Sequence, residues 1–275
     1  MHVAIGLYAI SAILHMFGLY ILKRFKPKRT SLSTQRLCLM NLCFAGFVLS
    51  IAGIAIRVLL LLRNPYSSHV LIWQTGFVNC WYMSITILLT FDRFLAVHLN
   101  IRYHLYWSTK KMCVGLFTVF IISVSISAVM MIIPVPMKTK FQLISAYVWP
   151  VYDVISLFAI MLTYIYLYYK IRENRKKELK LKKELNSNND NNFKELQKSF
   201  YLPTLIILSF LCFYVIPDMA FSIQMWTRKS LPKEVSTSIS MMYPIGIIVD
   251  AILCIAFPAK MYGDSSSKRI GCCCC

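Results

Sequence analysis

The sequence predicts an all-α membrane protein, a bundle of seven transmembrane helices with a short amphipathic segment after the seventh helix. Three observations predict this fold class. First, 58% of the 275 residues are apolar and only 15% are charged, more apolar surface than a soluble chain of this length could bury. Second, seven apolar stretches are long enough to cross a hydrocarbon core of roughly 30 Å as helices. Third, basic residues gather in every second connection between these stretches.

The predicted spans follow the long apolar runs in order along the chain. They cover residues 3–22, 37–62, 70–97, 113–133, 141–169, 200–225 and 235–257. Several exceed the roughly 20 residues that a helix needs to cross, which implies tilt or extension beyond the bilayer. The first run has no Lys or Arg before it and no small-residue cleavage site after it. We therefore expect a retained signal-anchor and not a removable signal peptide.

One transmembrane domain, residues 1–262, is predicted to carry two other segments. Residues 172–199 form a cytoplasmic third inner loop, in which a Lys/Glu-rich stretch extends span five as a helix before an Asn-rich stretch interrupts it. Residues 263–275 form a cytoplasmic tail that ends in a cysteine cluster. No internal repeat and no second domain are expected.

Positive charge is distributed unequally between the two sets of loops. The chain has 30 Lys and Arg against 11 Asp and Glu, for a net charge of +19. The loops after spans one, three and five, together with the tail, hold 23 of these basic residues, and the alternate loops hold 7. Because positive loops stay in the cytoplasm, we expect a plasma-membrane protein with an extracellular N-terminus and a cytoplasmic C-terminus. We therefore interpret the excess positive charge as a sign of membrane topology and not of nucleic-acid binding.

The strongest local pattern, FDRFLAVHLNIRYHLYWSTKK at residues 91–111, ends the third span. It resembles the rhodopsin-like (class A) family of G-protein-coupled receptors, whose third helix ends in Asp/Glu-Arg-Tyr before a short helical loop. Asp92, Arg93 and Phe94 hold this triplet. The resemblance implies that Asp92 neutralises Arg93 until the sixth span moves outward, when Arg93 contacts a heterotrimeric G protein. The alternative is an interfacial arginine whose side chain extends to the lipid headgroups.

Four more residues fall on motifs of this family. Tyr164 matches a tyrosine at the inner end of span five, and Pro217 matches the proline that kinks span six. Asp250 keeps an acid where the family has Asn-Pro-x-x-Tyr. Ile101 is an apolar residue in the basic loop after span three. The resemblance makes Ile101 a plug into a G-protein pocket, while packing against its own loop helix remains an equal alternative.

The chain also departs from the family pattern. Gly46 replaces the aspartate of span two that anchors a sodium ion, and His15 stands near the usual asparagine of span one. The proline and tyrosine after Asp250 and the paired outer cysteines are missing. These losses favour the alternative function, a non-signalling receptor-like protein that dimerises with or scaffolds other receptors. A channel or transporter would need polar residues continuous through the bundle, and here they are sparse.

Polar residues within the predicted spans give a candidate ligand pocket. A carboxylate inside the membrane is costly and is a functional candidate by default. Asp153 and Asp218 lie in spans five and six and are expected to contact a cationic or hydrogen-bond-donating group of an unknown small-molecule or peptide ligand. Thr75, Asn79 and Tyr243 are expected to line the same pocket. The alternative for the two acids is a protonated carboxyl that bonds neighbouring helices.

The chain ends in four consecutive cysteines after a Lys-Arg pair, Cys272, Cys273, Cys274 and Cys275. Cysteines beside a membrane with basic neighbours predict S-palmitoylation. A prenylated terminal cysteine is an alternative, and a metal cluster is disfavoured because no His lies nearby. No enzyme, cofactor or metal site is predicted, since the five histidines are dispersed and no Gly-rich phosphate loop occurs. The expected partners are a G protein, the ligand, the lipid bilayer and a second receptor in a dimer.

Overall fold

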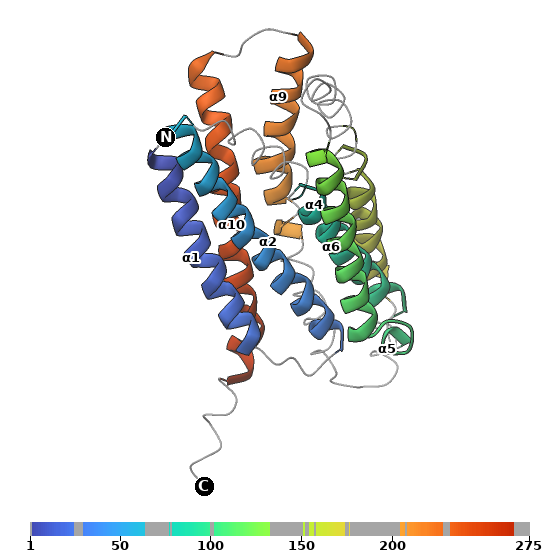
Figure 1. Ribbon diagram of the computed structural model, residues 1–275. Helices are drawn as coiled ribbons and strands as arrows, with labels where there is room; N and C mark the ends of the chain where they lie inside the picture. Colours follow the sequence, from blue (N-terminus) through green and yellow to red (C-terminus); the bar gives the residue numbers. More distant parts are fainter. Residues whose placement is uncertain are drawn as a thin grey trace, which may run out of the picture.

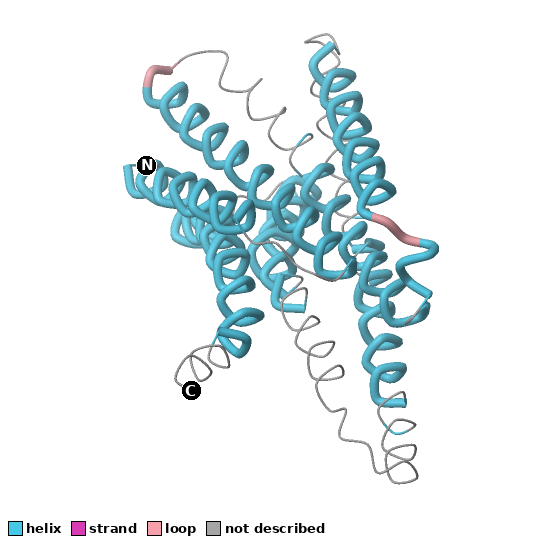
Figure 2. The backbone as a smooth tube through the Cα atoms, turned by 90° about the horizontal axis from the view of Figure 1, so that it is seen from below, coloured by secondary structure: helices cyan, strands magenta, loops and turns pink. Residues whose placement is uncertain are grey.

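The computed structural model describes the chain in several stretches that together are almost wholly helical (Figure 1). The described residues are 2–24, 30–63, 77, 79–99, 102–132, 151, 154–156, 158–173, 176, 204–206, 208–227 and 232–266. Throughout these stretches there is no strand, and long helices lie side by side. Figure 2, seen from below, shows that helices make up nearly all of this backbone. The all-α prediction is confirmed.

The elements occur in the order in which the apolar runs predict them. The described helices are α1 (His2–Arg24), α2 (Thr30–Leu61), α4 (Asn79–Leu99), α5 (Tyr103–Tyr106), α6 (Thr109–Ile132), α9 (Ile216–Thr227) and α10 (Lys233–Ser266), with a π-helix η3 (Leu211–Val215) directly before α9.

Among the described residues, six helices are long and apolar enough to cross a membrane, and a shorter apolar helix, Thr204–Val215, precedes α9. The candidate spans are His2–Arg24, Ser33–Leu61, Cys80–Leu99, Thr109–Val129, Val154–Glu173 and Thr237–Ala256. Helices satisfy all their backbone hydrogen bonds internally, as the interior of a bilayer requires. Large apolar side chains such as Ile13 and Phe117 are mostly exposed, which fits contact with lipid. The chain is a membrane-embedded helical protein.

Three helices extend further than the predicted spans. α2 begins at Thr30 and not at residue 37, α6 begins at Thr109 and not at residue 113, and α10 continues to Ser266. Most of the residues added to α2 and α6 are polar or basic, and the backbone stays helical beyond the apolar run. Through Ser266, the amphipathic segment predicted after the seventh span therefore belongs to the same helix as that span.

Arg36 shows why the first turns of α2 are ordered as part of the helix. Its Nε donates to the carbonyl oxygen of Leu22 at 2.7 Å, and its Nη2 donates to that of Lys23 at 3.2 Å. The last carbonyls of a helix lack partners within that helix, so Arg36 caps the end of α1 from α2. The sequence placed this arginine in a loop, among the charges that report topology.

α1 and α2 pack antiparallel, with side chains of α1 set against glycines of α2. A Cβ at Gly46 would lie 2.1 Å from Nε2 of His15, and a Cβ at Gly53 would lie 2.6 Å from Cε1 of Tyr8. The two large side chains lie seven residues apart on α1, and so do the two glycines on α2. Small residues let membrane helices approach closely, so these glycines set how the two helices fit together.

The most buried of the candidate spans is α4. Trp81, Tyr82, Met83 and Ile85 on this helix are all nearly inaccessible to solvent. They belong to one apolar core to which α1, α2, α6, η3 and α10 also contribute. α4 thus carries its polar residues, including Asp92 and Arg93, into the centre of the bundle.

Candidate functional site

Asp92 and Arg93 form a buried ion pair in the last two turns of α4. The exposed fraction is 0% for Asp92 and 1% for Arg93. The Arg93 guanidinium donates from Nε to Asp92 Oδ2 at 2.9 Å and makes a second contact from Nη2 to the same oxygen. The alternative of an arginine that extends to the headgroups is therefore wrong: Arg93 turns inward because a carboxylate beside it can neutralise it.

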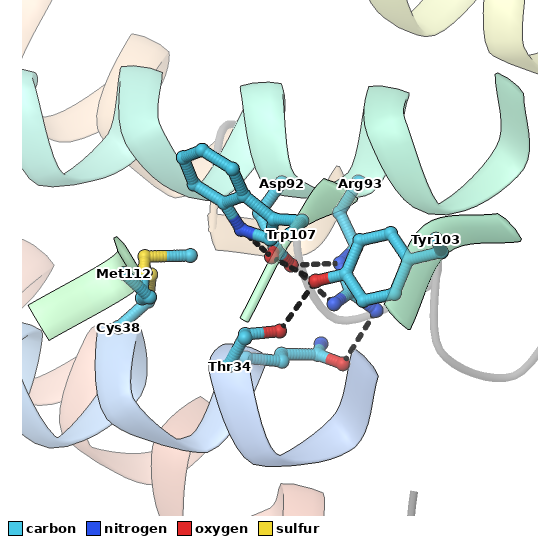
Figure 3. A network of polar contacts seen from close by, with 8 residues as sticks. Thr34, Cys38, Asp92, Arg93, Tyr103, Trp107 and Met112 are labelled. Atoms are coloured by element: carbon cyan, nitrogen blue, oxygen red, sulfur yellow. Dashed lines mark hydrogen bonds and ion pairs between the residues drawn. The ribbon is translucent and has the colours of Figure 1, made fainter. Parts of the chain in front are cut away.

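The second oxygen of Asp92 is held by the connection between α4 and α6. The Tyr103 hydroxyl donates to Oδ1 at 2.6 Å, and the Trp107 indole Nε1 donates to it at 3.0 Å (Figure 3). The Trp107 ring also packs edge-on against Phe91 at 5.5 Å between centroids. α5 and the residue after it therefore fold back over the end of α4, and both oxygens of the carboxylate are bonded.

The beginning of α2 supplies further contacts to this cluster. Arg93 Nη1 donates to Oε1 of Gln35 at 3.1 Å, and the hydroxyls of Thr34 and Tyr103 lie 2.8 Å apart. Thr34 and Gln35 are both fully buried. We refer to Thr34, Gln35, Asp92, Arg93, Tyr103 and Trp107 as the ion-pair cluster. It joins α2, α4 and α5.

The ion-pair cluster is bonded well enough to be stable in a buried site. A buried pair offsets its desolvation only if geometry is good and the remaining donors and acceptors are satisfied. Here one carboxylate accepts from a guanidinium, a phenol and an indole. Burial is the main cause that raises the pKa of the Tyr103 phenol, and the negative charge of Asp92 raises it further. Tyr103 therefore remains a protonated donor at physiological pH. The hydrogen bonds of the cluster connect α2, α4 and α5.

The sequence did not point to the contacts from α2. In the family that the motif resembles, an acid on span six often faces this arginine; no such acid is obvious here, and the nearest residues, Glu195 and Gln197, lie outside the described residues. Thr34 and Gln35 were assigned to the predicted loop before span two. Two polar residues directly before a long apolar run are a weak signal for a buried role, and only the early start of α2 reveals it.

Phe94 and Tyr164 lie beside the ion-pair cluster. The Phe94 ring stacks on His98 with 5.5 Å between centroids, and it also contacts Tyr166 at 5.7 Å. Tyr164 packs with Phe94 against Val97 and lies close enough to Arg93 to interact with its charge. Its hydroxyl has no hydrogen bond of good geometry within the described part of the chain. The structure thus brings four predicted residues, Asp92, Arg93, Phe94 and Tyr164, into one region.

A second polar cluster surrounds Asp250 on α10, whose exposed fraction is 1%. The Tyr82 hydroxyl of α4 donates to Oδ2, and the Tyr214 hydroxyl of η3 donates to the same oxygen at 3.3 Å. The rings of Tyr82 and Tyr214 stack at 5.4 Å, and Tyr243 meets Tyr214 edge-on at 6.1 Å. Ser209 lies near Asp250. The Ser209 hydroxyl and Oδ1 of Asp250 both lack a hydrogen bond among the described residues. We refer to Tyr82, Ser209, Tyr214 and Asp250 as the Asp250 cluster.

The backbone around the Asp250 cluster is specialised. The π-helix η3 ends at Val215, and Pro217 follows as the second residue of α9. A proline has no N–H to donate to the carbonyl four residues earlier, and wide π-turns occur at such positions and frequently at functional sites. On the facing helix, a Cβ at Gly246 would lie 2.4 Å from Cβ of Phe213. Only a glycine therefore lets α10 approach η3 this closely.

The structure also joins two departures from the family pattern that the sequence showed separately. The imidazole of His15 fills the space beside Gly46, where a side chain would collide with it. Nδ1 of His15 lies 2.8 Å from the carbonyl oxygen of Ser11, and the Ser50 hydroxyl donates to that of Ser11 at 2.9 Å. A small residue in span two opposite a polar residue in span one was the signal that could have predicted this contact.

The candidate ligand pocket is not brought together by the described residues. Thr75 and Asp153 lie outside them, as do Ile101 and the terminal cysteines. Asn79 begins α4 and Asp218 lies in α9, and nothing is described of their side chains. Of the predicted pocket residues, Tyr243 alone has a described side chain, and it contacts the Asp250 cluster.

Comparisons with known proteins give no relative for this chain: no family model matches it, and no curated protein matches it. Within the described residues, no group of three or more His, Cys, Asp or Glu is placed to hold a metal ion.

Proposed function

We propose that the protein is a seven-helix receptor of the rhodopsin-like type, which transmits binding of a small extracellular ligand to a heterotrimeric G protein. The observation that carries this proposal is the Asp92–Arg93 pair, buried at the end of an apolar helix and covered by a short loop helix. A buried charged pair inside a membrane protein is costly and points to function. Residues 91–111 resemble the end of the third helix in rhodopsin-like receptors, and this resemblance is the reason to propose G-protein coupling as that function.

The count of seven spans belongs to this proposal. Six helices qualify as spans, and the helical segment Thr204–Val215 continues through α9 to Thr227. Taken together, these residues are long enough for one more crossing at 1.5 Å per residue. An odd number of spans agrees with the unequal loop charge, which supports an N-terminus outside and a tail in the cytoplasm. The proposed location is the plasma membrane.

The proposed mechanism releases Arg93 from its buried partners. A ligand bound near Tyr243 would shift η3 and α9 about Pro217 and draw Tyr214 away from Asp250. Because Tyr82 bonds the same carboxylate, the shift would reach α4 through Tyr82. Movement of α4 relative to α2 would break the bond from Arg93 to Gln35 and free the guanidinium for a G protein.

G-protein dissociation in cells that express the full chain tests the proposal. Arg93→Ala should remove basal and ligand-driven dissociation, while Gln35→Ala should raise the basal signal because it removes one restraint on Arg93. Arg63→Ala is the matched control, since Arg63 is an exposed arginine just beyond α2 at the end remote from the ion-pair cluster. Equal signals in all four proteins at equal surface expression would refute signalling through Arg93.

A second candidate function has one specific observation in its favour. His15 fills the space at Gly46, where the resemblance places the aspartate that anchors a sodium ion. A bundle fixed at this point suits a non-signalling protein that dimerises with or scaffolds other receptors. Co-expression with a panel of receptors would then change their surface levels with Arg93→Ala and wild type alike. No change in any receptor would exclude this candidate.

The tail is proposed to be palmitoylated at Cys272, Cys273, Cys274 and Cys275. Replacing all four by serine should remove the label from cells fed a clickable palmitate analogue. Cys113→Ser is the control, because Cys113 is a free and exposed cysteine on α6. If the four-serine variant keeps the full label while Cys113→Ser loses it, the acylated site is on α6 and not in the tail.

A further inference from the structure

We expect the short helix α5 to lie at the surface of the membrane. It connects α4, which ends at Leu99, with α6, which begins at Thr109, and both helices are candidate spans. Figure 1 shows α5 at the lower end of the bundle, beside the first turns of α6. A connection between two adjacent spans is placed by their ends at the level of the lipid headgroups. The side chains of α5 that point away from the bundle therefore face lipid or water.

The side chains of α5 divide into an inward and an outward set. Tyr103 is buried and bonds Asp92, and the partly buried Trp107 directly after α5 also bonds Asp92. Leu105 and Tyr106 point away, with exposed fractions of 70% and 57%. An exposed leucine beside an exposed tyrosine is typical of a segment that sits in the membrane interface, where aromatic rings are enriched.

Cations surround the outward set. Arg102, Lys110 and Lys111 are all exposed. Nζ of Lys111 donates to the carbonyl oxygen of Tyr106 at 2.8 Å, which holds this ammonium group next to the apolar side chains. The outward surface of α5 and the first turn of α6 thus combines three positive charges with two residues suited to lipid.

The first 152 residues offer almost no negative charge to balance these cations. Asp92 is the only Asp or Glu among the first 152 residues, and it is buried against Arg93. The anions that neutralise Arg102, Lys110 and Lys111 must therefore come from outside this part of the chain. An anionic phospholipid supplies both a negative headgroup for the cations and an acyl region for Leu105, whereas a free phosphate or an acidic peptide supplies only the first.

We propose that α5 and the first turn of α6 form a binding surface for the headgroups of anionic phospholipids. Binding holds the outward set in the interface, so the inward set stays against Asp92. The lipid composition of this leaflet then stabilises the ion-pair cluster from outside. This inference rests on membrane embedding and on the described contacts, and it stands whether or not the protein couples to a G protein.

The test uses the full chain purified in detergent, with bound lipids counted by native mass spectrometry. Phosphatidylserine and phosphatidylcholine are added in turn to wild type, to Arg102→Ala/Lys110→Ala, and to the control Arg57→Ala/Arg63→Ala. The control removes the same charge from the other end of α2. Because each surface cation strengthens binding to anionic lipid about fivefold, the double variant should bind phosphatidylserine roughly 30-fold more weakly than wild type.

The outcomes separate the proposal from its alternatives. Selective loss of phosphatidylserine from Arg102→Ala/Lys110→Ala supports it, provided that the thermal unfolding midpoint without added lipid equals that of wild type. Equal loss in both double variants, or no loss in either, overturns it, since the surface would then have no special affinity. Displacement of the lipid by soluble glycerophosphoserine or by polyglutamate at similar concentrations also overturns it, because a bare anion would then suffice. Tyr106→Ser provides a second variant with all charges intact, and it should weaken phosphatidylserine binding as well.

Discussion

Gly46→Ala is the substitution whose effect the structure defines most closely. The new Cβ would lie 2.1 Å from Nε2 and 2.6 Å from Cδ2 of His15. Real side-chain contacts are never this short, so the imidazole must move. If it moves, His15 leaves the carbonyl oxygen of Ser11, which it contacts at 2.8 Å.

The magnitude follows from opposing effects. Forcing extra volume into a packed interface costs about 1–3 kcal/mol, and loss of a buried hydrogen bond costs about 1 kcal/mol more. Replacing glycine by alanine within a helix returns about 1 kcal/mol. We therefore expect Gly46→Ala to lower the free energy of unfolding by about 2 kcal/mol. In a His15→Ala background the obstacle is gone, and the same substitution should stabilise by about 1 kcal/mol.

The free energy of unfolding is measured in mixed micelles by titration with a denaturing detergent. The four proteins of the double-mutant cycle are wild type, Gly46→Ala, His15→Ala and the variant with both substitutions. Gly6→Ala on α1 is the control, because a Cβ there meets no heavy atom within 4 Å, and it should be neutral or slightly stabilising. A coupling of about 3 kcal/mol between positions 15 and 46 is the expected result. If Gly46→Ala were equally destabilising with and without His15, the fit between α1 and α2 described here would be wrong.

Three further substitutions can be judged by the same unfolding measurement. Asp92→Ala leaves the buried Arg93 uncompensated and should cost about 3–5 kcal/mol, whereas a loss under 1 kcal/mol would mean that Arg93 is solvated. Tyr103→Phe removes a 2.6 Å bond to a carboxylate and should cost about 1.5–3 kcal/mol, with no change expected if α5 were detached from α4. Gly246→Ala brings a Cβ to 2.4 Å from Phe213 and should cost about 1–3 kcal/mol; a neutral result would show that η3 and α10 are further apart.

The fold class could be predicted because it depends on composition and length. A chain with this much apolar surface must place it in lipid, and lipid admits only structures that satisfy the backbone internally. The first and last residues of the helices could not be predicted from composition and length. Arg36 and Lys110 look like loop residues because they are charged, yet a helix that leaves the hydrocarbon has no reason to end there.

The candidate site was predictable in its centre and not in its surroundings. Asp92 and Arg93 are neighbours in the chain, so their pairing needs no knowledge of the fold. The contact from Arg93 to Gln35 joins residues 58 positions apart, and that from Tyr103 to Thr34 joins residues 69 apart. Such contacts depend on which faces of α2 and α4 meet, and the apolar pattern of a lipid-embedded helix carries little information about its faces.

The Asp250 cluster shows the same division. The sequence singled out Asp250 as an acid within a span and Pro217 as a kink, but it assigned no partner to either. No pattern in the sequence marked Tyr82 as a partner, and the structure makes it a donor to Asp250. An intramembrane acid needs donors from somewhere, and which tyrosines supply them depends on the π-turn at η3, for which no sequence signal was seen.

α10 is longer than a bilayer is thick. At 1.5 Å per residue its 34 residues extend about 51 Å, against about 30 Å of hydrocarbon. The surplus extends this helix beyond the hydrocarbon, so a small change of tilt at Asp250 becomes a larger displacement at Ser266. Fatty acids attached to the cysteines that follow in the chain would tether the C-terminal end of α10 to the leaflet. Acylation would thereby restrict the angles open to α10, and de-acylation would free them.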